Sequence, residues 1–207
     1  MAESVEYFGF DNEEIKGGIF EKYKAKKGEI HRAGIIYTDP KAMFAGQKIH
    51  FKDRFFLCKQ GKCCEILGPA KWRVGCVLIK YATDKAGNIK KPLSYDLFPW
   101  AFSEQTYLKL KNINSDFPLA THDIKIGCDN DDYQHLIINP CPESIWTAKE
   151  ELKNAIAEQA KPVWENVKKS IASNLTVEEI NDLLGIGSST SIDPTTKIDL
   201  DSVLDKI

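Results

Sequence analysis

Short apolar runs rich in β-branched and aromatic residues follow one another from residue 34 onward. Such residues favour a pleated, half-buried strand, and turn-forming residues separate the runs. We therefore predict four short strands, at 34–37 (GIIY), 48–51 (KIHF), 54–59 (RFFLCK) and 63–67 (CCEIL). A longer apolar run, WRVGCVLIKYAT at 72–83, predicts a strand that is buried on both faces.

Two hairpins with one helix between them come next. The long run just described is followed by a turn and by LSYDLFPWA (93–101), which predicts a hairpin. Residues 122–140 predict a second hairpin across an Asp-rich turn, and Ser103 is the expected N-cap of the helix between the two. Two hairpins around one helix is the element order of the five-stranded OB barrel, which we place at about residues 50–141. Small Greek-key or SH3-like barrels share this pattern and stay open as alternatives.

From residue 143 onward the pattern becomes helical. Apolar residues recur at steps of three and four, the spacing of one helix face, at Leu152, Ile156, Ala160, Val163, Val167 and Ile171. Pro162 lies inside this stretch, so we expect a kink or a new helix there. Thr176 and Glu179 have the spacing of a capping box, and Gly185 is the expected end of the short helix that it opens.

These elements predict a mainly β fold with an α extension, an OB-fold five-stranded barrel plus C-terminal helices. No run approaches the ~18 apolar residues of a membrane span, and the acidic N-terminus is unlike a signal peptide. We therefore expect a cytoplasmic protein with no membrane partner. We divide the chain into a basic N-terminal arm (1–33), an OB-fold nucleic-acid-binding core (34–142), a helical extension (143–185), and a linker with an acidic tail (186–207).

Charge is strongly segregated along the chain, although the formal net charge is only −2. Residues 16–91 carry 18 Lys and Arg against 6 Asp and Glu, a net charge of +12, and the remaining segments are acidic. A basic segment of this size indicates a polyanionic partner. A lysine-rich surface that is merely solvated is the alternative.

Cations and aromatic rings are mixed on the strands and turns of the expected barrel. Binding to single-stranded DNA uses cations along the phosphates and exposed rings on which the bases stack. We therefore predict a nucleic-acid-binding surface made of Lys52, Arg54, Lys59, Lys62, Lys71, Trp72, Arg73, Lys80, Tyr81, Lys90, Lys91, Tyr95 and Trp100. For the rings of Trp72, Tyr81 and Trp100, the alternative is that they belong to the barrel core.

The six cysteines are expected to be reduced thiols, since nothing in the chain indicates export. His50, Cys58, Cys63 and Cys64 carry side chains suited to zinc, which needs four N or S ligands in a tetrahedron. On the predicted strand 63–67, however, Cys63 and Cys64 would point to opposite faces, and no C-x-x-C occurs. The sequence therefore favours buried free thiols. We predict no metal site and no cofactor, with zinc as the alternative.

Motifs of the common catalytic sites are absent from the sequence. The chain has no P-loop, no G-x-S-x-G and no G-x-G-x-x-G. Asp129, Asp131 and Asp132 cluster at the expected turn of the second hairpin, where Asp is favoured for backbone reasons. We therefore expect a protein that is not an enzyme, and a nucleic-acid-processing enzyme is the disfavoured alternative.

The C-terminal segment IDLDSVLDKI alternates acidic and apolar residues behind a linker rich in Gly, Ser and Thr. Such a segment can bind a basic groove on a partner, or shield the protein's own basic surface. An inert, frayed terminus is the alternative.

Taken together, these stretches resemble the single-stranded DNA-binding, helix-destabilising proteins of tailed bacteriophages. The resemblance lies in HFKDRFFLCKQGKCCEILG (50–68), the hairpin and helix of 72–114, HDIKIGCDNDDYQHLIINPCPESIW (122–146) and the acidic tail. It implies an OB-fold core that coats DNA during phage replication and recombination in the host cell cytoplasm. It also implies a tail that recruits a polymerase, helicase or primase. The best-known relatives hold structural zinc through one His and three Cys that include a C-x-x-C, a spacing that this chain lacks.

The function predicted from the sequence is sequence-tolerant binding of single-stranded DNA, which protects and presents the strand. Contacts to phosphates should make its affinity fall as the salt concentration rises. A polymerase-associated transcription or replication accessory factor is a second class that the sequence leaves open.

Overall fold

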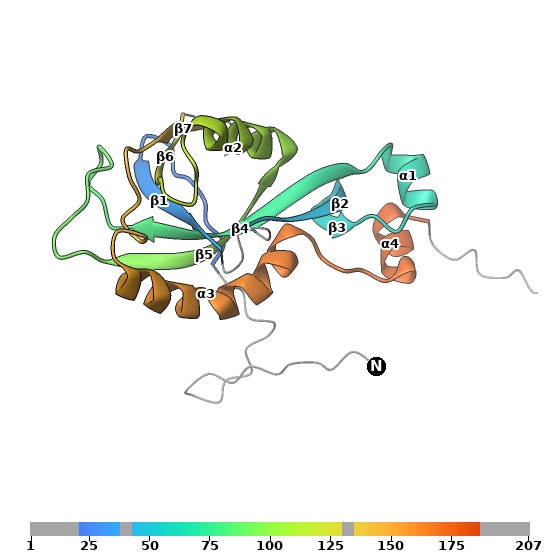
Figure 1. Cartoon of the computed structure of the whole chain (residues 1–207). Coiled ribbons are helices and arrows are strands. Elements are labelled where there is room, and N and C mark those ends of the chain that lie inside the picture. Colours follow the sequence, from blue (N-terminus) through green and yellow to red (C-terminus); the bar gives the residue numbers. More distant parts are fainter. Residues whose placement is uncertain (1–20, 38–42, 130–134, 187–207) are drawn as a thin grey trace, which may run out of the picture.

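A computed structural model describes residues 21–37, 43–129 and 135–186 of the chain. One antiparallel sheet and four helices make up this part (Figure 1). The strands are β1 (Ile30–Ile36), β2 (Ala45–Lys52), β3 (Arg54–Leu57), β4 (Lys71–Tyr81), β5 (Tyr95–Ser103), β6 (Ile124–Cys128) and β7 (Leu136–Pro140). The helices are α1 (Lys62–Leu67), α2 (Glu104–Asp116), α3 (Glu150–Ile171) and α4 (Val177–Leu184).

β4 is the central strand of the sheet, because three strands pair with it. β5 runs along nearly its whole length on one edge, from Arg73↔Ser103 to Tyr81↔Tyr95. On the other edge, β2 pairs with the first half of β4 and β1 pairs with the second half. The order β3-β2-β4-β1-β6-β7, with β5 paired to β4, describes an open sheet.

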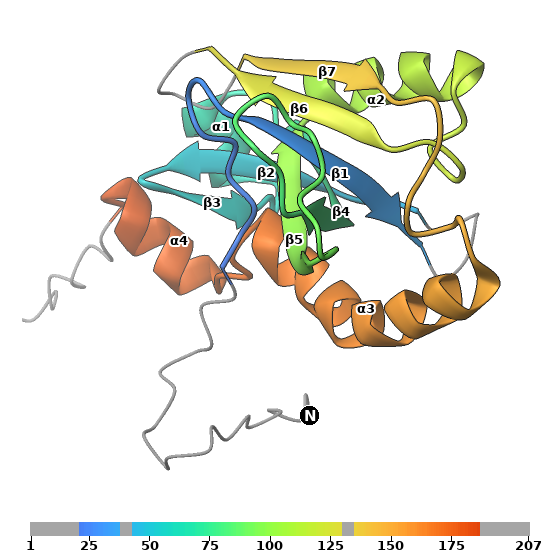
Figure 2. The same cartoon turned by 90° about the vertical axis from the view of Figure 1, so that its left-hand side faces the viewer.

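The two faces of β4 pack against different helices, because side chains alternate between the faces of a strand. Cys76 is buried in a cluster with Leu110 of α2, whereas Val77 is buried in a cluster with residues of α3. Gly75 also lies on the α3 face, where a Cβ atom would come within 2.8 Å of Val167. A glycine at this position therefore lets α3 lie close against the sheet. Figures 1 and 2 show α2 and α3 on opposite sides of β4 and β5.

β2, β3, α1 and the start of β4 extend to one side of the sheet and form what we call the side lobe (residues 45–73; Figure 1). Its own small core includes residues of α4 and consists of Phe56, Cys63, Leu175, Ile180 and Leu184. The chain between α3 and α4 also pairs with β3. The N–H of Leu57 donates to the carbonyl of Ser173 at 3.0 Å, and the N–H of Ser173 donates to the carbonyl of Phe55 at 2.9 Å. This pairing attaches the side lobe to the end of α3.

Most of the predicted elements are confirmed. The hairpins β4–β5 and β6–β7 form with α2 between them. At the start of α2, the side chain of Ser103 accepts a hydrogen bond from the N–H of Thr106, as expected of its N-cap. The capping box of Thr176 and Glu179 opens α4, which ends at Gly185 in a left-handed conformation.

Three expectations require correction. Residues 63–67 lie in the helix α1 and not in a strand, and a short apolar run does not by itself distinguish the two. α3 continues through Pro162 as one helix, so no second helix begins there, and apolar residues on both sides of the proline are buried against the sheet. The described strands form an open, mainly antiparallel sheet, so the closed barrel is not shown.

Part of the expected N-terminal arm packs into the main core. Tyr23 and Ala25 are buried there, and β1 begins at Ile30. The acidic tail from residue 187 onward, and Asp131 and Asp132 of the Asp-rich turn, lie outside the described residues. Within the described ranges, no helix is both long and apolar enough to span a membrane.

A buried carboxylate joins β1, β4 and the segment that precedes α3. Asp123 is fully buried and accepts hydrogen bonds from Arg32 Nε at 3.2 Å and from Ser144 Oγ at 2.9 Å. The N–H of Ile145 donates to it at 3.1 Å and the hydroxyl of Tyr81 at 3.4 Å. One side chain therefore satisfies four donors from three parts of the fold.

Replacing Asp123 with alanine should lower the free energy of unfolding by about 3–5 kcal/mol, because it leaves a partly buried cation and several buried donors without their acceptor. Chemical denaturation of the Asp123→Ala variant measures this loss. Asp96→Ala is the matched control, since Asp96 is exposed on β5 and should change stability by less than about 0.5 kcal/mol. Equal stability of the two variants would show that the Asp123 network does not hold these segments together.

Candidate metal centre and nucleic-acid interface

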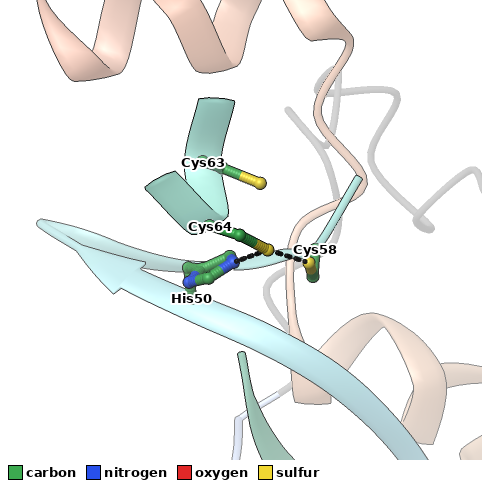
Figure 3. Close-up of side chains that lie close together, drawn as sticks. All are labelled: His50, Cys58, Cys63 and Cys64. Atoms are coloured by element: carbon green, nitrogen blue, oxygen red, sulfur yellow. Dashed lines mark hydrogen bonds between the residues drawn. The ribbon is translucent and has the colours of Figure 1, made fainter. Parts of the chain in front are cut away.

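Four side chains with metal-binding atoms converge at the tip of the side lobe (Figure 3). They are His50 of β2, Cys58 just after β3, and Cys63 and Cys64 of α1. Their ligand atoms all lie within 4.8 Å of one another. Cys64 Sγ lies 3.3 Å from Cys58 Sγ and 3.4 Å from His50 Nε2. The cluster thus draws on three consecutive elements of the chain.

The turn between β3 and α1 brings the two neighbouring cysteines to the same side. Gln60 and Gly61 both adopt positive φ angles, 63° and 64°, which reverse the chain directly after Cys58. The first turn of α1 then carries Cys63 and Cys64, whose side chains are about 100° apart around the helix axis. On a strand they would point to opposite faces, which is why the sequence argument separated them.

The donor set and its spacing fit a tetrahedral zinc ion. Structural zinc sites use four Cys or His ligands, and Cys₃His is one of the common sets. With Zn–S bonds of about 2.3 Å, two sulfur ligands of a tetrahedron lie about 3.8 Å apart. Cys64 Sγ lies 3.3 Å from Cys58 Sγ, and all ligand atoms lie within 4.8 Å of one another, so small side-chain rotations would bring them to tetrahedral distances. The four residues therefore fit the metal.

Metal binding needs thiolates and a neutral imidazole, and two of the four residues, Cys58 and His50, are shifted toward these forms. Burial raises the pKa of the Cys58 thiol, but hydrogen bonds from the Gln60 N–H and from Cys64 bring it below its usual value. The pKa of Cys64 is raised to about 11, because its thiol shares a hydrogen bond with Cys58. Burial lowers the pKa of His50, which favours the neutral ring.

The expected nucleic-acid-binding residues fall into two separate groups. Lys52, Arg54, Lys59, Lys62, Lys71, Trp72 and Arg73 lie on the side lobe or its edge. Lys80, Tyr81, Lys90, Lys91 and Tyr95 lie at the far end of the β4–β5 hairpin, and Trp100 lies within β5. Figure 1 shows the hairpin end and the side lobe at opposite ends of the molecule. The expected surface is therefore not continuous.

Two of the expected stacking rings belong to the core. Tyr81 is 1% exposed and its hydroxyl accepts a hydrogen bond from the N–H of Trp146. Trp100 is 3% exposed and packs edge-to-face against Tyr23. Both rings are therefore core residues, which is the alternative that the sequence left open. Trp72, in contrast, is 45% exposed.

Exposed rings on the side lobe lie next to cations. Lys48 Nζ lies 6.0 Å from the ring centre of Trp72, and the guanidinium of Arg73 lies 3.7 Å from that of Phe55. Phe51 is 60% exposed and contacts Phe55 across the β2–β3 hairpin, with ring centres 4.8 Å apart. Burial lowers the pKa of Arg73 to about 10, so that it remains charged at neutral pH.

These contacts lie on two faces of the side lobe. Lys48 pairs with Trp72 in the register of β2 and β4, so their side chains share the face that continues toward α2. Phe51 is three residues further along β2 and therefore points to the other face, as do its partner Phe55 and Arg73. Seven Lys and Arg against two Asp and Glu give residues 45–73 a net charge of +5. Both faces are thus aromatic and basic.

Sequence reasoning missed Lys48, Phe51 and Phe55. The signal was present in FKDRF (51–55), in which two Phe flank a short turn and cations alternate with them. Residues on either side of a tight hairpin turn lie opposite each other on one face. Reading 48–59 as a hairpin would therefore have paired the two rings.

Comparison of the chain with models of known protein families, with curated proteins and with solved structures found no match. The geometry of the side lobe and the charge of the chain therefore carry the functional argument.

Proposed function

We propose that the chain binds single-stranded DNA, with little overall sequence preference, through the side lobe. The observation that carries this proposal is the set of exposed rings beside cations on residues 45–73, above all Lys48 with Trp72. Stacking of a base on an exposed ring contributes about 1–3 kcal/mol and tolerates every base, since each has a π-face. Exposed cations such as Arg54 and Lys71 supply the phosphate contacts.

The strand pairings support an OB-type core for this function. In an OB barrel the first strand pairs with the second and the fourth, the second with the third, and the fourth with the fifth. β1, β4, β5, β6 and β7 make these same pairings in that order, with α2 between the third and fourth members. The side lobe is then an elaboration of the loop between the first and second strands, a loop with which OB folds bind oligonucleotides.

We also propose that His50, Cys58, Cys63 and Cys64 hold one structural Zn²⁺. Within the described residues, the buried apolar core of the side lobe and α4 is small, with five buried residues and a rim of partly buried ones. A metal bound by β2, by the end of β3 and by α1 would join these elements and order the hairpin that carries Phe51 and Phe55. The metal has no catalytic part in this proposal.

The wider biological setting is proposed on the resemblance alone. On this proposal, the chain is a non-catalytic protein that coats DNA during phage replication and recombination in the host cytoplasm. The acidic tail would recruit a polymerase, helicase or primase. Recruitment by the tail is tested separately from DNA binding, by deleting residues 187–207.

Binding of the full chain to fluorescent oligo-dT tests the proposed function. We expect the anisotropy to rise on binding, and the affinity to fall steeply as salt increases, with a log–log slope of about −0.7 per phosphate contact. Double-stranded DNA of the same length is the control and should bind more weakly, since its bases are not free to stack. Absence of binding at low salt, or an affinity that does not change with salt, would contradict the proposal.

A further inference from the structure

A hollow of about 320 Å³ lies where the side lobe meets α2, and aromatic rings form much of its lining. The rings come from three elements: Phe44 precedes β2, Trp72 is on β4 and Tyr107 is on α2. Gly46 of β2 and Val74 of β4 also line the hollow. Glu104 is the acidic residue of the lining. We call this hollow the aromatic slot.

The lining residues hold the rings in place while leaving space between them. The indole of Trp72 lies over Gly46, where a Cβ atom would approach its six-membered ring to 3.2 Å, so a larger residue would displace it. Phe44 and Tyr107 pack edge-to-face, with ring centres 5.4 Å apart. Lys48 stands beside Trp72 at the surface. A flat ring that enters the slot therefore meets aromatic surface and has a cation nearby for an attached phosphate.

Glu104 gives the aromatic slot a hydrogen-bonding preference. It is exposed in the first turn of α2 and makes no side-chain hydrogen bond or ion pair within the described residues. Its carboxylate therefore offers two free acceptor oxygens. Guanine presents adjacent N1–H and N2–H donors on its Watson–Crick edge, whereas thymine presents one N–H between two carbonyl acceptors that a carboxylate repels.

We propose that the aromatic slot is a base-reading subsite that prefers guanine to thymine, with Glu104 as the residue that sets the preference. The inference rests on the proposed binding of single-stranded DNA and adds one selective position to a surface that otherwise tolerates every base. Trp72 provides the stacking surface, and Lys48 contacts the phosphate next to the bound base. In the simpler role of Glu104, its charge only stabilises the N-terminus of α2, which would give no base preference.

Oligo-dT with one central dT replaced by dG tests the aromatic slot, using the full chain. We expect the dG oligonucleotide to bind about tenfold more tightly than plain oligo-dT, within the range that a bidentate contact to a base provides. Deoxyinosine at the same position keeps N1–H but lacks the N2 amino group, and should give an intermediate affinity. Glu104→Gln should reduce the preference for dG over dT to less than about twofold.

Glu151→Gln is the matched control, because Glu151 is likewise an exposed acid in the first turn of a helix, α3. It should keep the full preference for dG. Equal binding of the dG and dT oligonucleotides by the unmodified chain would overturn the subsite but not the proposed function. An unchanged preference for dG over dT in Glu104→Gln would have the same consequence. Failure to bind any of the oligonucleotides would overturn both the proposed function and the subsite.

Discussion

Replacing Cys63 with serine should prevent the proposed zinc from binding to the purified chain and loosen the side lobe. Cys63 is 2% exposed and belongs to both the metal cluster and the small core with α4. A hydroxyl is a much weaker zinc ligand than a thiolate, so we expect the zinc affinity to fall by at least about 100-fold. Metal analysis of the unmodified chain should find one zinc per chain, and the variant should retain little of it after dialysis.

Chelation provides the second measurement on the metal cluster. Because metal bound only by the folded state stabilises it, a strong chelator should lower the melting temperature of the unmodified chain and have little effect on Cys63→Ser. Cys76→Ala is the control, since Cys76 is fully buried in the main core, away from the cluster. It should lose stability but keep its zinc. A chain that binds no zinc, or a Cys63→Ser variant that binds zinc as tightly as the unmodified chain, would contradict a metal site here.

Removing four cations from the side lobe should weaken DNA binding by on the order of 100-fold at low salt, through loss of phosphate contacts. The variant replaces Lys48, Lys52, Arg54 and Lys71 with glutamine. Arg73 and Lys59 are kept, because they bond to Ile171 and Asn174 and help to hold the fold. If all four cations contact phosphates, the log–log salt slope should become shallower by about 3.

A control variant with the same change in net charge separates local contacts from overall electrostatics. Glutamine at Lys85, Lys111, Lys149 and Lys161 removes four exposed cations, all outside residues 45–73. This control should retain most of the affinity and nearly the full salt slope. If both variants lost affinity equally, the side lobe would not be the binding surface.

The sequence predicted the regular parts of the fold because their signals are local. The alternation and length of β4 and β5, the N-cap at Ser103 and the capping box at Thr176 each depend on a few neighbouring residues. The sheet order depends on distant pairings, such as β1 lying between β4 and β6, which no local pattern specifies. The open sheet was therefore not predicted, although the element order from β4 to β7 was.

The candidate site was predicted only in part, because its geometry also depends on how distant parts of the chain fold together. The metal cluster was rejected because 63–67 was assigned to a strand, and the change to a helix depends on the backbone reversal at Gln60 and Gly61. The burial of Tyr81 and Trp100 likewise depends on which face of each strand a helix covers. Charge segregation is a property of composition, and many of the cations that it singled out lie at the surface in the structure.

Photo-crosslinking of the zinc-loaded full chain to single-stranded DNA that contains 5-bromouracil tests whether the DNA bases stack on the side lobe. Bromouracil forms covalent bonds to aromatic rings on which it stacks, and mass spectrometry of the digested complex identifies the attached residue. Trp72 and the exposed rings Phe51 and Phe55 should carry the adducts, and excess unmodified oligo-dT should prevent them. Adducts confined to the far end of the β4–β5 hairpin or to α3, or no adducts under conditions of saturating DNA, would contradict DNA binding through the side lobe.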